Sequence, residues 1–189
     1  MFKNWKIKQF NKRASSPNFK PQEVINSLGI KEGDIIADIG SGGGYYSFEF
    51  AKLVGEKGKV FAVDTEQNLL DHIKNEINKH KLTNVETVLI KDNGTALPTN
   101  GFDLIFLRNV FHHLPEPFKF FGNIKKYLKL NGRIAIIDYK KYRFNLFRLG
   151  KHFVAESEIV DTMTKCGYSI SKKFDFLLEQ SFIIFKKGS

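Results

Sequence analysis

Residue types that would support several kinds of site are scarce in this sequence. Cys166 is the only cysteine, which excludes an intramolecular disulfide and a centre built from several thiolates. The five histidines do not show metal-ligand spacing, so we predict no metal site. No apolar run reaches the roughly 18 residues of a membrane-spanning helix, and no signal-peptide pattern opens the chain. We therefore expect a cytoplasmic protein with no transmembrane segment.

Arginine is scarce as well, although the chain is strongly basic. The net charge is +10, from 30 Lys and Arg against 20 Asp and Glu. Only five of these cations are arginines, whereas phosphate recognition favours clustered arginine. Dispersed lysine is typical of a compositional bias. Nucleic acid therefore stays a possible partner, but we favour a small molecule.

The length and composition predict one folded domain preceded by a short basic arm. A chain of 189 residues, 42% of them hydrophobic, can bury a substantial core. Residues 1–20 are basic with interleaved aromatic residues, and Ser15-Ser16-Pro17 would break a helix there. We predict that residues 1–20 form an arm or a short cap and that residues 21–189 form the main domain.

From residue 21 onward, predicted strands and helices alternate. Apolar runs without a period of two indicate strands covered on both faces, as in a parallel sheet. Only a few residues separate the last two strands, so a crossover helix cannot join them and they should be antiparallel. We predict a doubly wound α/β fold with a seven-stranded, mostly parallel sheet and an antiparallel last strand. The predicted strands are 34–39, 60–63, 85–90, 102–107, 134–137, 168–174 and 182–185, and the predicted helices are 21–28, 45–54, 67–80, 117–128 and 156–166.

The strongest motif is Asp38-Ile-Gly-Ser-Gly-Gly-Gly44, which lies directly after the first predicted strand and before a helix. Glycines allow tight turns and let a ligand approach the backbone amides at a helix start. A nucleoside-triphosphate loop would need lysine and then Ser or Thr after the glycines, but Tyr45 and Tyr46 stand there. The glycine spacing also differs from G-x-G-x-x-G, and Asp38 would repel a pyrophosphate while it can bind an amine.

Asp64 ends the second predicted strand, 20 residues after Gly44. An acidic residue at this point can accept hydrogen bonds from both ribose hydroxyls of an adenosine. A strand-end aspartate by itself is more often a helix cap, but the glycine-rich loop before it favours the ribose contact. A site for an amine and a ribose, without a site for phosphate, suits S-adenosylmethionine.

These motifs resemble those of the class I S-adenosylmethionine-dependent methyltransferases, over about residues 21–187. The most similar branch contains the ubiquinone/menaquinone-biosynthesis-like small-molecule methyltransferases. The Asn-Pro-Pro-Tyr-type motif of enzymes that methylate amino groups of adenine or glutamine is missing after the fourth strand. Residues 38–44 resemble motif I, 60–64 the acidic second-strand motif, 91–98 the adenine loop, 102–114 the fourth-strand motif and 128–134 the turn into the fifth strand.

The resemblance implies a Rossmann-like methyltransferase fold and an enzyme that transfers a methyl group from S-adenosylmethionine to a small-molecule acceptor. Transfer would be an in-line displacement, with S-adenosylhomocysteine as the product. The resemblance also implies which residues bind the cofactor. They are Asp38 for the amino end, Gly40, Ser41, Gly42 and Gly44 for the methionine part, Asp64 and Thr65 for the ribose, Asp92 or Asn93 for the adenine, and Arg108 beside the methyl-transfer site.

A general base is needed only if the acceptor atom carries a proton. We select His113 and Asp138 as candidate catalytic residues, with His112 as a second choice, because they follow the fourth strand and end the fifth. A capping, packing or turn-forming role is the alternative for each. Residues 139–152 are basic and aromatic, so they can cover the crevice, stack on bases or lie on a membrane. Two other functions stay open: a methyltransferase acting on RNA or protein, and a non-catalytic S-adenosylmethionine-binding protein.

Overall fold

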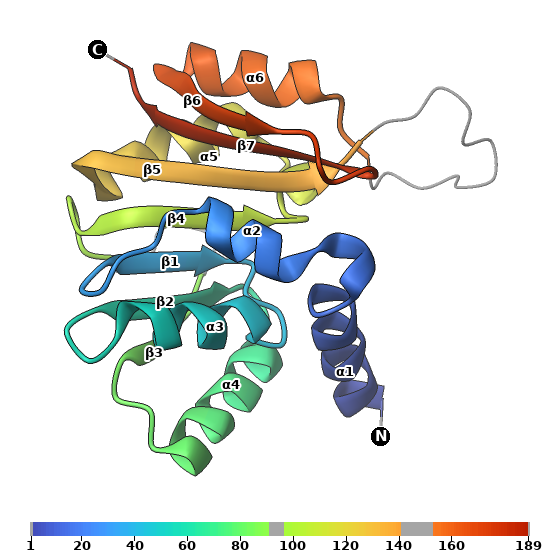
Figure 1. The fold of residues 1–189 in the computed structure, drawn as a ribbon, viewed down its shortest axis with the longest axis vertical. Coiled ribbons are helices and arrows are strands. Elements are labelled where there is room, and N and C mark those ends of the chain that lie inside the picture. The colour runs from blue at the N-terminus through green and yellow to red at the C-terminus, as the bar shows by residue number, and fades with distance from the viewer. Residues whose placement is uncertain (1, 91–96, 141–152, 189) are drawn as a thin grey trace.

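Seven strands form one sheet in the computed structural model, which describes residues 2–90, 97–140 and 153–188. Within these ranges the strand order is β3-β2-β1-β4-β5-β7-β6, and β7 runs antiparallel to both of its neighbours. The order reverses between β1 and β4, so the sheet is doubly wound, as Figure 1 shows. This arrangement confirms the predicted fold class. The strands are β1 (Ile35–Ile39), β2 (Lys59–Asp64), β3 (Val85–Leu89), β4 (Phe102–Arg108), β5 (Leu128–Tyr139), β6 (Tyr168–Phe174) and β7 (Gln180–Lys187).

Helices cover both faces of the sheet (Figure 1). On one face Phe50 of α3 meets Phe106 of β4 edge-on, with ring centroids 5.1 Å apart. On the other face Phe121 of α5 and Ile159 of α6 pack into a second buried cluster. No helix in the described ranges is long and apolar enough to cross a bilayer. The helices are α1 (Phe2–Ala14), α2 (Pro21–Ser27), α3 (Tyr45–Val54), α4 (Gln67–His80), α5 (Pro117–Ile124) and α6 (Glu156–Lys165), with three 3-10 turns at Pro17–Phe19, Phe111–His113 and Lys125–Tyr127.

The predicted boundaries agree with α3 and α4 and differ most around β5. This strand begins at Leu128 rather than at residue 134, because a register shift against β4 absorbs the extra residues. The helix predicted to reach residue 128 ends at Ile124, and a 3-10 turn leads from it into the strand. Hydrophobic periodicity does not encode such a bulge, since the added residues pair with no single partner residue.

Residues 2–14 form the helix α1, where the sequence predicted an arm or a short cap. The helix ends at Ala14, just before the Ser15-Ser16-Pro17 segment that was predicted to break it. Ile7 and Ala14 lie buried on its inner side. Figure 1 places α1 at the carboxyl edge of the sheet, where the parallel strands end.

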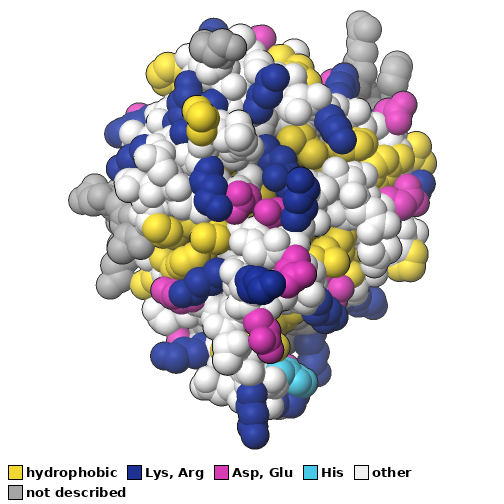
Figure 2. Space-filling view, turned by 60° about the vertical axis from the view of Figure 1, so that its left-hand side comes forward, with side chains coloured by type: hydrophobic (Ala, Val, Ile, Leu, Met, Phe, Trp, Pro, Cys, Tyr) yellow, Lys and Arg dark blue, Asp and Glu magenta, His cyan; other side chains and the backbone are white. Residues whose placement is uncertain are grey.

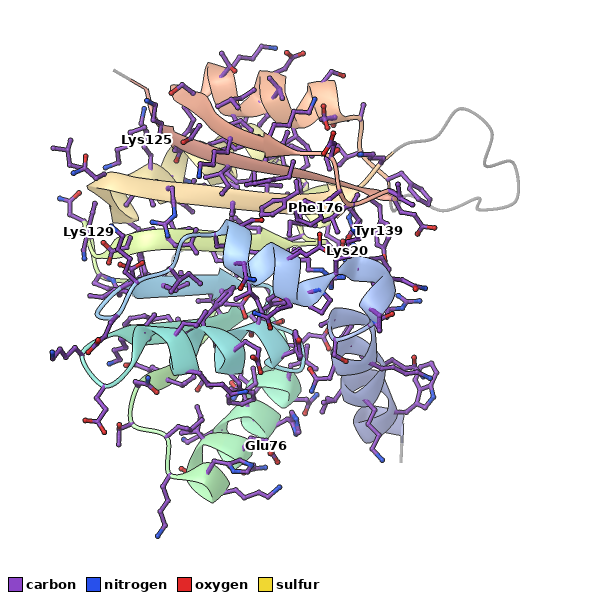
Figure 3. The ribbon with its side chains drawn as sticks, in the orientation of Figure 1. Lys20, Glu76, Lys125, Lys129, Tyr139 and Phe176 are labelled. Atoms are coloured by element: carbon purple, nitrogen blue, oxygen red, sulfur yellow. The ribbon has the colours of Figure 1, made fainter. Side chains whose placement is uncertain are left out.

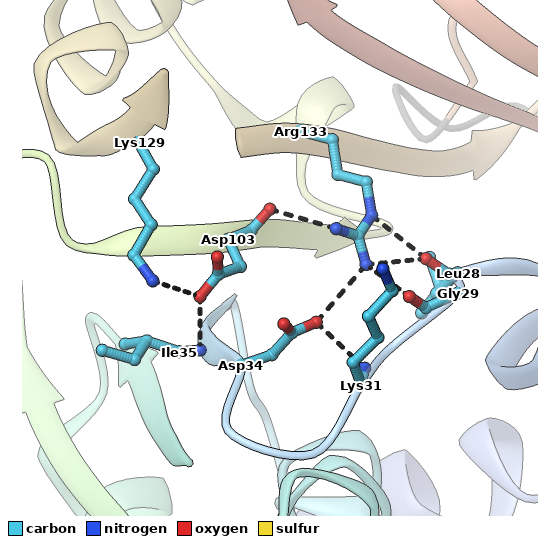
Figure 4. A network of polar contacts seen from close by, with 8 residues as sticks. All are labelled: Leu28, Gly29, Lys31, Asp34, Ile35, Asp103, Lys129 and Arg133. Atoms are coloured by element: carbon cyan, nitrogen blue, oxygen red, sulfur yellow. Dashed lines mark hydrogen bonds and ion pairs between the residues drawn. The ribbon is translucent and has the colours of Figure 1, made fainter. Parts of the chain in front are cut away.

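The opposite, amino edge of the sheet is held by a polar network, drawn in Figure 4. Arg133 of β5 donates four hydrogen bonds, of 2.8 to 3.4 Å, to the backbone carbonyls of Leu28, Gly29 and Asp103. The Asp103 carboxylate accepts from the Ile35 backbone amide at 2.8 Å and pairs with Lys129 at 2.6 Å. Figure 2, which brings this side forward, shows acidic side chains interspersed among Lys and Arg. Arg133 and Lys129 at this edge therefore stabilise the fold.

Candidate active site

The glycine-rich loop follows β1 at the point where the strand order reverses. Gly40, Gly42 and Gly44 have φ angles of 74°, 56° and 85°, in the left-handed region that side-chain-bearing residues rarely adopt. A Cβ atom on Gly40 would also collide with Val110, which follows β4. Ligands in open α/β sheets bind outside the carboxyl ends of the strands at such a reversal. The loop therefore lies where a bound ligand is expected.

Asp64 joins this loop to the end of β2. One carboxylate oxygen accepts from the Gly42 backbone amide at 2.9 Å, and the other accepts from the Glu66 backbone amide at 3.0 Å. Thr65, beside it, is exposed. The two motifs singled out from the sequence, which are 20 residues apart, thus form one contiguous surface.

Asp38 is buried at the end of β1, where its carboxylate accepts a 2.5 Å hydrogen bond from the Ser47 hydroxyl of α3. Burial raises the pKa of Asp38 to about 7, and the hydrogen bond from Ser47 only partly opposes this rise. The nearby Asp64 carboxylate adds to the increase, whereas Arg108 lowers it. A cationic ligand group beside Asp38 would stabilise its charged form.

Arg108 ends β4 on the same face of the sheet as Asp38. Its guanidinium lies 5.1 Å from the centroid of the Phe19 ring and 5.6 Å from that of Tyr46. Among the described residues it makes no hydrogen bond or ion pair, and its Nη2 atom is buried. The guanidinium of Arg133 at the amino edge, by contrast, donates four hydrogen bonds. Arg108 is half-buried as a whole, but a guanidinium nitrogen that is buried without a polar partner is costly, so this geometry favours an anionic ligand group at Arg108.

Further buried polar atoms at the carboxyl edge lack partners. Such atoms are rare in folded proteins, and a cluster of them at one place indicates a site for a polar ligand. Phe19, which contacts Arg108, also meets Tyr139 at the end of β5, with ring centroids 6.1 Å apart, and Figure 3 labels Tyr139 at this edge. The unpartnered atoms in the described ranges include Asn11 Oδ1, Ser41 Oγ, Tyr46 OH, Arg108 Nη2 and Gln180 Oε1.

The helix α1 lies across the loop and the end of β2. The Asn11 side chain donates to the Gly43 carbonyl at 3.0 Å, and the ring of Phe10 lies 3.6 Å from the position that a Cβ atom on Gly42 would take. Lys6 pairs with Glu66 at 2.6 Å, next to Asp64. These contacts join α1 both to the glycine loop and to the segment that follows β2.

A buried histidine–aspartate pair lies after β4. His112 Nδ1 is 2.6 Å from an Asp138 carboxylate oxygen, and Asp138 also accepts from the backbone amides of His112 and Tyr139, at 3.2 and 2.7 Å. Asp138 is fully buried, so its only route to a ligand in this arrangement is through the histidine. The rings of His112 and His113 are 4.0 Å apart. The imidazole that Asp138 orients is therefore that of His112, not His113.

The structure thus brings most of the predicted site residues to one edge. Asp92 and Asn93, which were predicted to reach the adenine, lie outside the described residues, and so does the segment 141–152 of the predicted cap. Sequence reasoning missed Asn11 and Ser47, because neither stands in a motif. It also missed the 2.6 Å hydrogen bond from Gln180 to the Asn109 side chain, which joins residues 71 positions apart.

A family model described as a methyltransferase domain matches residues 30–180. This chain belongs to the S-adenosylmethionine-dependent methyltransferases. A methyltransferase of this kind from Aquifex aeolicus has a solved structure that is 31% identical in sequence, with a TM-score of 0.85 over 95% of this chain and 96% of that one. S-adenosylmethionine is the cofactor of the family, and the unpartnered polar atoms, the glycine loop and Asp64 fit it.

Two further comparisons limit what the family alone can say about the reaction. The ubiquinone/menaquinone biosynthesis C-methyltransferase UbiE of Francisella tularensis subsp. novicida is 27% identical over 121 residues, or 64% of this chain. The matched part spans 48% of that relative, about half its length. The [4+2]-cyclase SpnF shares the fold, with a TM-score of 0.75 over 88% of this chain and 79% of that one, at 12% identity. The fold by itself therefore does not fix the reaction, which must be argued from the site.

Proposed function

We propose that this protein transfers the methyl group of S-adenosylmethionine to a small-molecule acceptor by in-line displacement. The observation that carries the proposal is the contact between the glycine loop and Asp64, at the reversal point of the sheet. A nucleoside placed there would meet a carboxylate for its ribose hydroxyls and a loop of glycines, whose backbone a ligand can approach closely, for its tail.

Each end of the cofactor would meet a complementary group. Asp64 would hold the ribose hydroxyls with Thr65 beside it, and Gly40 to Gly44 would line the methionine part. Asp38 and Arg108 carry opposite charges on one face of the sheet yet are not ion-paired with each other. A zwitterionic amino acid tail would satisfy both, its ammonium at Asp38 and its carboxylate at Arg108. The adenine contact of Asp92 or Asn93 stays a prediction.

The bound cofactor supplies a methyl group that its sulfonium already activates. The chain's own residues then have to position the acceptor, exclude water and, where needed, take a proton. His112 is the stronger candidate for the last task, because Asp138 fixes its Nδ1 side and orients the ring. His113 is its neighbour and stays the alternative. Asp138 acts through the histidine and is a positioning residue in this proposal.

A small molecule is the acceptor that the observations favour. The UbiE relative is named for quinone biosynthesis. The cations of the amino edge are engaged in the fold or mixed with acids, which leaves little of the positive charge there for nucleic acid. The carboxyl edge instead offers aromatic rings, at Phe19, Tyr46 and Tyr139.

Calorimetric titration with two ligands tests the cofactor site. S-adenosylhomocysteine carries the amino acid tail, whereas 5′-methylthioadenosine keeps the nucleoside and lacks the tail. Asp64→Asn should weaken both ligands by about 10-fold or more, because both present ribose hydroxyls. Arg108→Gln should weaken S-adenosylhomocysteine by roughly 10- to 100-fold, as expected for a lost charge-assisted hydrogen bond, and leave methylthioadenosine nearly unchanged.

Matched controls are Asp161→Asn and Lys57→Gln, both at exposed positions away from the loop. Thermal unfolding of every variant separates a binding defect from a folding defect. If the folded wild-type protein binds neither ligand, the proposed function is wrong. If Arg108→Gln weakens both ligands equally, Arg108 supports the site as a whole and does not receive the carboxylate.

A further inference from the structure

The outer face of α1, formed by Trp5, Lys8, Lys12 and Arg13, has no role in the proposed methyl transfer. Residues at positions i, i+3 and i+7 share one side of a helix, which places Trp5, Lys8 and Lys12 together. All four are exposed, and Trp5 is 65% exposed. The opposite side of the helix carries Ile7, Asn11 and Ala14, which pack on the glycine loop and the domain.

The charge of this helix has one sign. Its sequence, FKNWKIKQFNKRA, has five basic residues and no acidic residue. Lys6 is neutralised by Glu66, but Glu66 belongs to the loop after β2 and lies beside the site, away from the outer face. The helix C-terminus favours nearby cations, which accounts for Lys12 and Arg13 in part. It does not account for an exposed tryptophan between lysines, since a large apolar ring in water has an unfavourable hydration free energy.

We propose that the outer face of α1 binds the surface of an anionic lipid bilayer. Lysine and arginine close to an anionic membrane contribute roughly 1 kcal/mol each, about a factor of five in partitioning. Tryptophan prefers the membrane–water interface, because its ring is apolar while its indole N–H can still donate a hydrogen bond. Lys8, Lys12 and Arg13, which form no ion pair within the described part of the chain, and the ring of Trp5 are complementary to such a surface in both charge and polarity.

The same face fits nucleic acid less well. Sequence-tolerant binding of single strands uses several aromatic rings as stacking platforms together with arginine. The outer face of α1 offers one ring and one arginine. Lysine, a compact and strongly hydrated cation, serves a diffuse anionic surface without needing bidentate geometry.

The position of α1 gives this contact a consequence for orientation. The helix lies at the carboxyl edge of the sheet, against the glycine loop, so a bilayer on its outer face would lie on the same side of the molecule as the candidate active site (Figure 1). Vesicle binding itself does not depend on methyl transfer. Failure of either proposal therefore leaves the other testable.

Trp5 is the only tryptophan of the chain, so its fluorescence reports on this face alone. The full chain is mixed with vesicles of phosphatidylcholine and phosphatidylglycerol in equal parts, and with vesicles of phosphatidylcholine alone. We expect the emission to shift to shorter wavelength with the anionic vesicles only. The shift should weaken as salt is raised, because exposed charges are screened.

Cosedimentation of variants with the anionic vesicles measures the partition coefficient. Lys8→Gln with Lys12→Gln should lower it roughly 25-fold, from a factor of five for each lysine. The matched control is Lys57→Gln with Lys165→Gln, which removes the same charge from exposed positions near the amino edge. Trp5→Ala should also lower it, whereas Leu130→Ala, at a position 84% exposed on the amino edge, should not.

Four results would overturn the proposal. One is an unchanged emission with anionic vesicles. The second is an equal loss of binding in the matched lysine control, which would indicate a net-charge effect. The third is an emission already shifted without vesicles in proportion to protein concentration, which would assign the face to a second copy of the chain. The fourth is retention on heparin without vesicle binding, which would assign the face to a polyanion.

Discussion

At the scale of single residues, the buried Asp38 carboxyl is held at a cost to stability. It is buried, with a pKa raised to about 7, while its carboxyl would ionise near 3.8 in an unfolded chain. The native state therefore binds more protons than the unfolded state between these values. Stability consequently falls as the pH rises from about 4 to 7 and levels off above. In the proposed function, a cationic ligand group beside Asp38 would stabilise the ionised carboxylate and offset this cost.

Asp38→Asn should remove this dependence on pH. Relative to the wild type, the variant should gain about 2–3 kcal/mol in free energy of unfolding between pH 5 and pH 8, since it has no proton to lose. Urea unfolding at the two pH values measures the difference. Ser47→Ala is the companion variant, because it removes the hydrogen bond that favours the charged form. A benefit of Asp38→Asn that is equal at both pH values would contradict the assignment.

At the scale of elements, α1 is the part whose role the sequence predicted least. Its only buried residues with described side chains are Ile7 and Ala14, too small a stripe to stand out among the lysines. The contacts that define its role, from Asn11 to Gly43 and from Lys6 to Glu66, join residues 32 and 60 positions apart. Hydrophobic periodicity indicates which side of a helix is buried, but it does not indicate which loop that side packs against.

Deletion of residues 1–14 should weaken the site more than the fold. The helix buries little apolar surface, so we expect the unfolding temperature to fall by only a few degrees. Dissociation of S-adenosylhomocysteine should become about 5- to 10-fold faster, because two polar contacts and the Phe10 ring no longer hold the loop. Stopped-flow displacement measures this rate. Asn11→Ala, a smaller change, should show part of the effect, and an unchanged rate in both variants would refute the role of α1.

At the scale of the whole molecule, stability depends on the last strand of the sequence. β7 inserts between β5 and β6, so the C-terminal segment closes the sheet. Phe182 of this strand is fully buried and stacks on Phe174 of β6, with ring centroids 4.5 Å apart. Phe176 meets the ring of Phe182 edge-on. The chain therefore completes its core only when its end is in place.

Phe182→Ala should lower the free energy of unfolding by about 3–5 kcal/mol, because it leaves a cavity in the buried cluster on the α2 and α3 face of the sheet. Urea unfolding of the variant beside the wild type measures the loss. Leu130→Ala is the control, at an exposed position of β5, and should stay within about 0.5 kcal/mol. A small effect of Phe182→Ala would mean that the core relaxes around the gap.

The sequence by itself determined the alternation of strands and helices, the antiparallel last strand, the glycine loop and the acidic end of β2. Each of these features depends on residues that are close together in the sequence, so hydrophobic periodicity and the positions of glycines are enough to predict it. The bulge at the start of β5 was missed, since an irregular pairing leaves the local hydrophobic pattern unchanged.

Only the tertiary structure decided which of these residues meet. It paired Asp138 with His112 rather than His113, gave Asp38 a hydroxyl partner in Ser47, and left Arg108 Nη2 without a polar partner among the described residues. It also laid α1 over the glycine loop. Such pairings depend on which groups the sheet order and the crossover helices bring together, because a buried polar atom must find its partner in space and not along the chain.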